Sequence, residues 1–125
     1  MIGFTDSWNE YLDTIPVKMQ DLYFREEYVK LYETDDEKAC CFIYQENNRI
    51  MLFPFLRRSF YYKGNEFFDF ETAYGYGGPI SNDYSEEFMT KSLQAMIEEA
   101  KKENYVCGFT RFHPLLNNWI FFDKV

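Results

Sequence analysis

Histidine and cysteine are scarce in this chain, and this limits the metal and nucleophile chemistry open to it. The 125 residues include one histidine, His113, and three cysteines, Cys40, Cys41 and Cys107. Adjacent cysteines point to opposite faces of a strand, and no two of the three have the CxxC spacing of metal and redox motifs. We therefore expect reduced thiols, no metal site and no cysteine nucleophile.

Basic residues are outnumbered, and long apolar runs are missing. Thirteen Lys and Arg stand against 21 Asp and Glu, for a formal net charge of −8. Binding to nucleic acid needs a basic face, and the short pairs at residues 57–58 and 101–102 do not provide one. No apolar run approaches the roughly 20 residues of a transmembrane helix, and residues 1–6 lack a basic and apolar leader. The composition predicts a cytoplasmic protein that neither binds DNA by itself nor spans a membrane.

Aromatic residues are abundant, at 22% of the chain, with 14 Phe and 11 Tyr. Each large ring buries much area, so a domain of this length can form a stable core. The same rings favour either a surface that packs against a partner or an aromatic-lined cleft. We expect residues 1–125 to form a single domain.

Apolar spacing predicts an α+β fold in which two short N-terminal helices and one long helix pack on an antiparallel meander. The helices are expected at residues 6–16, 25–33 and 85–103, with 21–24 extended between the first two. The strands are expected at residues 39–44, 49–56, 60–62, 66–70 and 105–112. Pro54 cannot donate to a strand ladder, so it indicates a bulge or a sheet edge. Asp83 or Ser85 can cap the long helix.

A glycine-rich loop separates the meander from the long helix. It consists of Tyr74, Gly75, Tyr76, Gly77 and Gly78, followed by a proline. Glycine is favoured where the backbone takes positive φ or where another group comes close. A strand–loop–helix junction of this kind often holds a ligand, but a tight turn whose tyrosines cover the core has the same sequence. Both interpretations stay open at this point.

The C-terminal segment is unusually apolar. It ends in Trp119, Ile120, Phe121 and Phe122, although chain ends are usually polar and frayed. We expect these four residues to dock on something, either a missing C-terminal lobe or a second copy of the chain in a homo-oligomer.

Four segments resemble a known family. DLYFREEYVKLYE at 21–33, MLFPFLRR at 51–58, YGYGGP at 74–79 and FTRFHPLL at 109–116 resemble, in the same order, FemAB-like aminoacyltransferases and related acetyltransferase-like proteins. The order of elements also matches the first part of the GCN5-related N-acetyltransferase (GNAT) fold. The resemblance covers nearly the whole chain and implies a GNAT-like half domain.

The resemblance implies transfer of an acyl or aminoacyl group onto an amine acceptor. In the peptidoglycan-building members the donor is an aminoacyl-tRNA and the acceptor is a cell-wall precursor. Members usually carry a second lobe, so we expect this chain to be the N-terminal lobe, inactive alone and without its own cofactor. The donor of a full-length relative would be acyl-CoA or aminoacyl-tRNA. The alternatives are a non-catalytic binding module with an aromatic surface, and a compact acetyltransferase completed by a second copy.

Acyl transfer needs a proton acceptor and donors aimed at the developing oxyanion. His113 is the candidate base, with a structural strand-end role as the alternative. Arg111 is expected to face a substrate carboxylate or phosphate, or else to pair with one of the many acids. Arg57, beside Arg58, is a candidate for an anionic acceptor or a solvated strand end. Backbone N–H groups of the glycine loop are candidate oxyanion donors.

The tyrosines of the glycine loop, Tyr74 and Tyr76, are expected either to line a cleft or to pack on the core. Coenzyme A is not expected to bind in this half of the fold. Asp83, Glu86 and Glu87 place carboxylates around the helix N-terminus that would otherwise hold a pyrophosphate.

Overall fold

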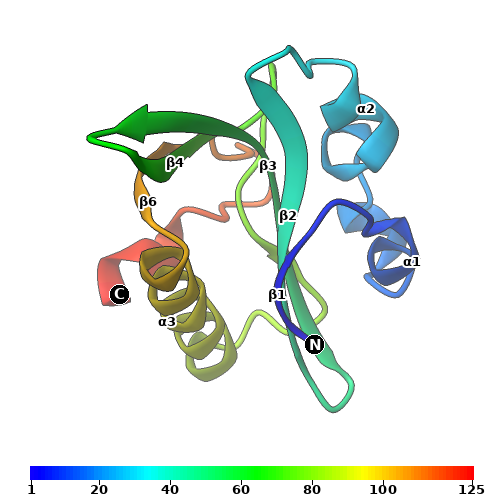
Figure 1. Ribbon diagram of the computed structural model, residues 1–125. Coiled ribbons are helices and arrows are strands. Elements are labelled where there is room, and N and C mark those ends of the chain that lie inside the picture. Colours follow the sequence, from blue (N-terminus) through cyan, green and yellow to red (C-terminus); the bar gives the residue numbers. More distant parts are fainter.

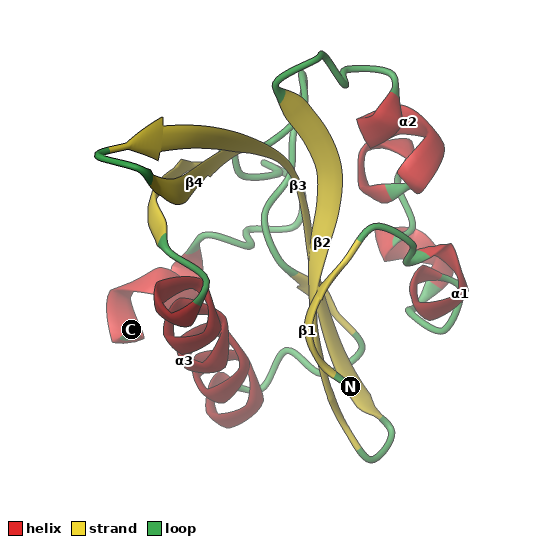
Figure 2. Ribbon diagram, viewed as in Figure 1, coloured by secondary structure: helices red, strands yellow, loops and turns green.

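A mixed sheet lies between two layers of helices (Figure 1). The computed structural model describes residues 1–125, apart from the side chain of Lys124. Helices α1, Asn9–Leu12, and α2, Glu26–Lys30, lie on one side of the sheet, and α3, Glu86–Lys102, lies on the other (Figure 2). The chain therefore has the α+β fold that the apolar spacing predicted.

The sheet holds six strands. Their bounds are β1 Ile2–Thr5, β2 Glu37–Glu46, β3 Arg49–Tyr62, β4 Asn65–Glu71, β5 Ile80–Ser81 and β6 Tyr105–Phe109. The order across the sheet is β1-β2-β3-β4-β6, with β5 paired to β3. Strands β1 to β4 are antiparallel to their neighbours, which confirms the meander, whereas β6 runs parallel to β4.

Several strand boundaries differ from those expected. The expected strands 49–56 and 60–62 are one continuous strand, β3. Strands β1 and β5 were not expected, because four and two residues are too short for a clear alternation and depend on pairing with β2 and β3. The last strand, expected over residues 105–112, ends at Phe109, and Phe112 forms an isolated bridge with Gly77.

The N-terminal helical region also differs from the expectation. Residues 21–24, expected to be extended, contain the 3₁₀ helix η2, Leu22–Phe24. This turn buries the Phe24 ring. The backbone carbonyl of Phe24 accepts a hydrogen bond from Trp8 Nε1 over 2.7 Å. The expected helix 25–33 is only five residues long, because the chain turns after Lys30. A further 3₁₀ helix, η1, spans Val17–Met19.

Side chains of β2 and β3 alternate between two hydrophobic cores. Cys41, Ile43 and Leu52 lie in the core beneath α1 and α2, together with Trp8. The opposite core, beneath α3, is lined by the alternate residues of both strands, which are Cys40, Phe42, Tyr44, Met51, Phe53 and Phe55. Adjacent Cys40 and Cys41 thus point to opposite faces, as predicted.

Pro54 marks a local edge of the sheet. It pairs with Cys41 of β2 in a register that continues without a shift on both sides. On the other side of β3, β5 pairs with Met51 and Leu52 and β4 begins to pair at Leu56, so neither strand reaches Pro54. Of the two alternatives, the structure has the edge and not the bulge.

Helix α3 agrees closely with its prediction. Ser85 is the N-cap, and its Oγ accepts a hydrogen bond from the backbone N–H of Phe88 at 3.3 Å. Phe88, Met89 and Leu93 are buried against the sheet at helical spacing. Lys102 lies in the last turn, where it complements the helix dipole. Within the described residues no helix is both long and apolar enough to cross a bilayer.

The apolar C-terminal segment folds back onto the same chain. It forms the 3₁₀ helix η3, Ile120–Lys124, beside α3. Phe121 is buried in the α3 core, and the Phe122 ring lies 5.2 Å from that of Phe112. Trp119 and Ile120 stay exposed. The expected contact with a partner therefore remains a prediction for Trp119 and Ile120 only.

Candidate functional site

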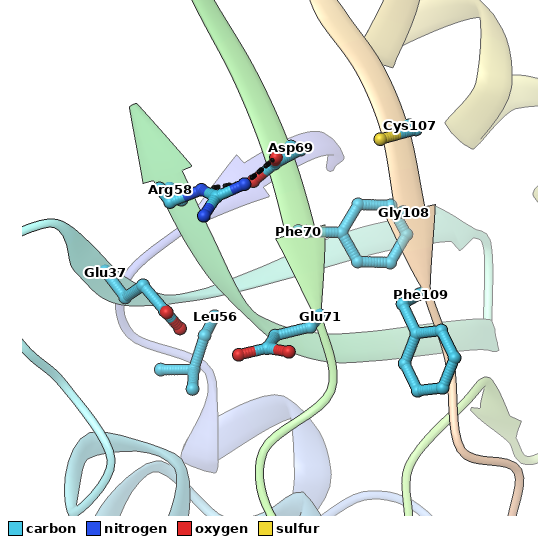
Figure 3. A pocket seen from close by; sticks show the side chains of 9 residues that line it. All are labelled: Glu37, Leu56, Arg58, Asp69, Phe70, Glu71, Cys107, Gly108 and Phe109. Atoms are coloured by element: carbon cyan, nitrogen blue, oxygen red, sulfur yellow. Dashed lines mark hydrogen bonds and ion pairs between the residues drawn. The ribbon is translucent and has the colours of Figure 1, made fainter. Parts of the chain in front are cut away.

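A polar groove opens where the start of β2, the middle of β3 and the ends of β4 and β6 lie side by side, and Figure 3 shows its side chains. Its first part has a volume of about 230 Å³ and is lined by Glu37, Leu56, Arg58, Asp69, Phe70, Glu71, Cys107, Gly108 and Phe109. A second hollow shares Glu37, Leu56 and Glu71 with the first, and adds Tyr32, Thr34, Thr72, Tyr74 and Arg111. We call the two together the acceptor groove.

Strand register places the side chains of the groove in two neighbouring rows. Glu37 pairs with Arg58, Arg58 with Asp69, and Asp69 with Cys107. The next row, two residues along each strand, contains Leu56, Glu71 and Phe109. Because residues two apart share a face, both rows point into the groove. These residues come from four strands and meet only because the strands pair in this register.

The carboxylates of the groove differ in their partners. Arg58 holds Asp69, its Nε donating to Oδ1 over 3.1 Å. Glu37 and Glu71 point toward one another above Leu56 (Figure 3). The pKa of Glu37 is raised by burial and then by the charge of Glu71 and a hydrogen bond with it. Among the described side chains Glu37 and Glu71 form no ion pair, and the nearby Arg58 guanidinium, which pairs with Asp69, lowers the pKa of Glu37 by less than burial and Glu71 raise it. The two facing carboxylates therefore form a place for a cation.

The raised pKa of Glu37 beside Glu71 leads to a pH prediction. Glu71→Gln removes the neighbouring charge, so the midpoint of Glu37 in a ¹³C-carboxyl NMR titration should fall toward its ordinary value. The folded pKa of Glu37 is raised, so this group favours folding less as the pH rises through the interval between its unfolded and folded values. Glu37→Gln should therefore gain stability relative to wild type as the pH rises through this interval. A Glu37 midpoint that does not move in Glu71→Gln would contradict the pairing.

Two of the residues singled out from the sequence lie in the groove. Tyr74 and Arg111 line its second part, next to Glu71. The Arg111 guanidinium lies over the Phe109 ring, 5.3 Å from its centre, and has no ion-pair partner among the described side chains. The expected salt bridge of Arg111 to an acid of the same chain is therefore absent, and its charge is available to a ligand.

Arg57 faces the other way. Its guanidinium lies over the Phe68 ring at 4.7 Å, in a separate hollow that also contains Lys38 and Cys40. Adjacent residues of a strand point to opposite faces, so Arg57 and Arg58 do not grip one ligand. The groove arginine of β3 is Arg58, and the contact of Arg57 with an anionic acceptor stays a prediction for the other face of the sheet.

The glycine loop is packed too closely to form an open cradle. Gly75 and Gly78 have positive φ values of 99° and 94°. A Cβ atom on Gly75 would lie 2.4 Å from the Tyr23 ring, and one on Gly77 would lie 2.6 Å from Thr72 Cγ2. The N–H of Gly77 already donates to the Arg111 carbonyl over 2.6 Å. That N–H is therefore not free to serve as an oxyanion donor.

Asn118 ties this loop to the C-terminal segment. The Asn118 side chain is fully buried, and its Nδ2 donates to the carbonyls of Gly77 and Pro79 over 2.8 and 3.1 Å. Its Oδ1 accepts from the backbone N–H of His113 at 3.0 Å. One amide thus satisfies three buried backbone groups from two distant segments. The sequence analysis missed Asn118, because nothing near it in sequence indicates that the loop lies beside it.

His113 is held by contacts on both ring nitrogens. Its Nδ1 accepts from the backbone N–H of Leu115 at 3.3 Å, so Nε2 carries the proton and donates to Asp21 Oδ2 over 3.0 Å. The ring is buried and stacks on Phe24, with Tyr76 beside it. No lone pair is left to accept a substrate proton. The geometry matches the structural alternative for His113, and Tyr76 packs against it.

The N-terminus of α3 is occupied by its own acids and an arginine. Asp83 Oδ1 accepts from the Ser85 backbone N–H at 2.9 Å, and Arg49 donates to Glu87 over 2.7 Å. Strand β5 and residues 82–85 separate this end of the helix from the glycine loop. A pyrophosphate would meet carboxylates here, and the absence of coenzyme A binding remains a prediction with this physical reason.

Comparisons of the chain with protein-family models, with curated proteins and with solved structures found no match. The site is therefore interpreted from its geometry and from the chemistry of its side chains. Among the described residues, no three His, Cys, Asp or Glu side chains are arranged to hold a metal ion.

The sequence contained a partial signal for the missed groove residues. Asp69 lies in the predicted strand 66–70 and Glu71 directly follows it, so a strand one residue longer would place both on one face. Glu37 and Cys107, however, lie 32 residues before and 38 after Asp69 in the numbered chain. Only the register of β2, β3, β4 and β6 brings them together.

Proposed function

We propose that the chain is the N-terminal lobe of a FemAB-like or GNAT-like acyl- or aminoacyltransferase, and that the acceptor groove holds the amine acceptor. The single observation that carries this proposal is the facing pair Glu37 and Glu71 in an open groove. An amine acceptor reaches an enzyme mainly as an ammonium ion. Two carboxylates without a paired guanidinium attract such an ion and discriminate against an anion.

The groove also offers a path for the proton that the acceptor must lose. An amine attacks an acyl carbonyl only after it is deprotonated, and a carboxylate with a raised pKa is a stronger base than an ordinary one. The pKa of Glu37 is raised, with burial as the largest cause. In the proposed step the ammonium first loses one proton to the Glu37–Glu71 pair. The amine nitrogen then bonds to the carbonyl carbon, the bond between the acyl group and its carrier breaks, and the second amine proton goes to the departing oxygen or sulfur of the carrier. The donor, acyl-CoA or aminoacyl-tRNA, would be held by the second lobe.

The element order supports the same proposal. Two short helices, an antiparallel meander, one long helix and a final strand follow each other as the family resemblance implies. The four resembling segments also lie around one region. Residues of the glycine loop and of the Phe109–Phe112 stretch line or border the groove, and Tyr28 of α2 donates through its Oη to the Tyr74 carbonyl.

Binding of an isolated amine tests the acceptor role. We expect Nα-acetyl-lysine N-methylamide, which carries one ammonium group and no carboxylate, to bind in calorimetry. Glu71→Gln should weaken this binding about 10-fold or more, since a charge-assisted hydrogen bond contributes at least about that much. Glu98→Gln on α3, outside the groove, is the matched control and should bind as wild type does.

The same titration distinguishes recognition of the amine from non-specific binding. The Nε-acetylated form of the ligand has no positive charge and should not bind. Coenzyme A should give no binding heat, and acetyl-CoA should not be turned over by the chain alone. Equal affinity for the charged and the acetylated ligand would contradict an amine site.

A non-catalytic binding module is the second candidate function. The return of η3 onto its own chain favours it, because Phe121 completes the core without a partner. The exposed rings of Tyr32, Tyr74 and Tyr76 would then form the aromatic surface that holds a partner chain. Mutation of Tyr74 and Tyr76 to Ala would abolish partner capture under this alternative but would change amine affinity little.

A further inference from the structure

The acceptor groove contains charges of both signs. Glu37 and Glu71 line both of its hollows, and Arg111 lines the second hollow together with Tyr74. Arg111 has no ion-pair partner among the described side chains, although Glu71 lines the same hollow. The strand geometry holds the two charges apart within one cavity.

The separation follows from the backbone. Glu71 pairs with Phe109, and Arg111 follows Phe109 by two residues. The Arg111 side chain therefore starts two residues beyond the row that contains Glu71. The Arg111 backbone is fixed on both sides, because its N–H donates to Thr72 Oγ1 over 3.0 Å and its carbonyl accepts from Gly77. The start of the side chain is therefore anchored while the guanidinium end is exposed.

The floor between the two charges is partly apolar. Leu56 lies beneath Glu37 and Glu71, and the rings of Tyr32 and Tyr74 border the hollow. Phe109 carries the Arg111 guanidinium on its face. The groove thus presents a negative charge, an apolar surface and a positive charge. A ligand in which a short aliphatic or peptide chain joins an ammonium to an anion fits this arrangement.

We propose that the acceptor is a zwitterion, which carries a free carboxylate as well as the reactive amine. Its ammonium lies between Glu37 and Glu71, and its carboxylate meets the Arg111 guanidinium. This inference rests on the proposed function, since it assigns the amine of the acceptor to the same carboxylates. It adds the class of acceptor, an amino acid or a short peptide with a free C-terminus, and it gives Arg111 the role of a specificity residue.

The test compares 6-aminohexanoate with 6-aminohexanamide, which differ only in the carboxylate. In calorimetry on the full chain we expect the acid to bind about tenfold tighter than the amide, as one charge-assisted contact provides. Arg111→Gln should remove this advantage and leave the affinity for the amide unchanged. Glu71→Gln should weaken both ligands.

Arg57→Gln is the matched control, because Arg57 also lies over an aromatic ring but on the opposite face of the sheet. It should keep the full preference for the acid. An unchanged thermal midpoint in Arg111→Gln verifies folding, since the hydrogen bonds of the Arg111 backbone to Thr72 and Gly77 do not use its side chain.

The outcomes separate the two proposals. Equal binding of acid and amide by wild type, or a preference that survives Arg111→Gln, overturns the zwitterion and leaves the amine site standing. Absence of binding by both ligands overturns the amine site and the zwitterion with it.

Discussion

Replacing Asn118 with alanine is expected to lower the free energy of unfolding by about 3–5 kcal/mol, because it leaves three buried backbone groups unsatisfied at about 1–3 kcal/mol each. Those groups are the His113 N–H and the Gly77 and Pro79 carbonyls. Urea unfolding measures the change. The free energy of unfolding of a folded domain is only about 5–15 kcal/mol, so Asn118→Ala should be close to unfolded at 37 °C.

Asn65→Ala provides the control for this experiment. Asn65 is exposed at the start of β4, and its substitution should change stability by less than about 0.5 kcal/mol. Amide hydrogen exchange in the two variants adds a local readout, since Asn118→Ala should lose protection at Gly77 first. A cost below about 1 kcal/mol for Asn118→Ala would show that the amide does not hold the glycine loop.

Gly78→Ala is the second substitution with a large expected effect. The φ of Gly78 is 94°, and an added Cβ would lie 2.7 Å from Asn118 Nδ2 and 2.9 Å from Phe112 Cδ1. A left-handed alanine costs about 1–2 kcal/mol, and overpacking adds about 1–3 kcal/mol. We expect a loss of about 2–5 kcal/mol in urea unfolding, since both costs apply.

Gly64→Ala separates strain from packing. Gly64 also has positive φ, at 80°, but nothing lies within 4 Å of its Cβ position. Its substitution should cost only the strain, about 1–2 kcal/mol. If Gly78→Ala and Gly64→Ala lost equal stability, Gly78 would be needed for its backbone angle alone and not for the close approach of Asn118.

Local sequence patterns predicted the parts of the fold that local interactions determine. The long helix was predictable because its capping residue, its apolar spacing and its charged turns all lie within one segment. The hairpin of β2 and β3 was predictable from two apolar runs around a polar turn. Strand β1 was not, because four residues are held mainly by pairing with β2, across more than 30 residues of chain.

The candidate site was predictable only in part, for a related reason. Tyr74 and Arg111 lie in the groove, as their flanking motif indicated. Its carboxylates could not be assigned, because Glu37 and Glu71 become neighbours through β3, which lies between their strands. His113 attracted a catalytic interpretation as the only histidine, but its role depends on Asp21, 92 residues away.

The central claim is that a ligand amine binds between Glu37 and Glu71 and not at the glycine loop. A ¹H–¹⁵N NMR map of the chain titrated with Nα-acetyl-lysine N-methylamide tests it most directly. The amides of residues 37, 71 and 109 should shift together with one saturation curve, while those of Gly77 and Phe88 stay in place. Shifts confined to the glycine loop or to the start of α3, with the groove unmoved, would contradict it.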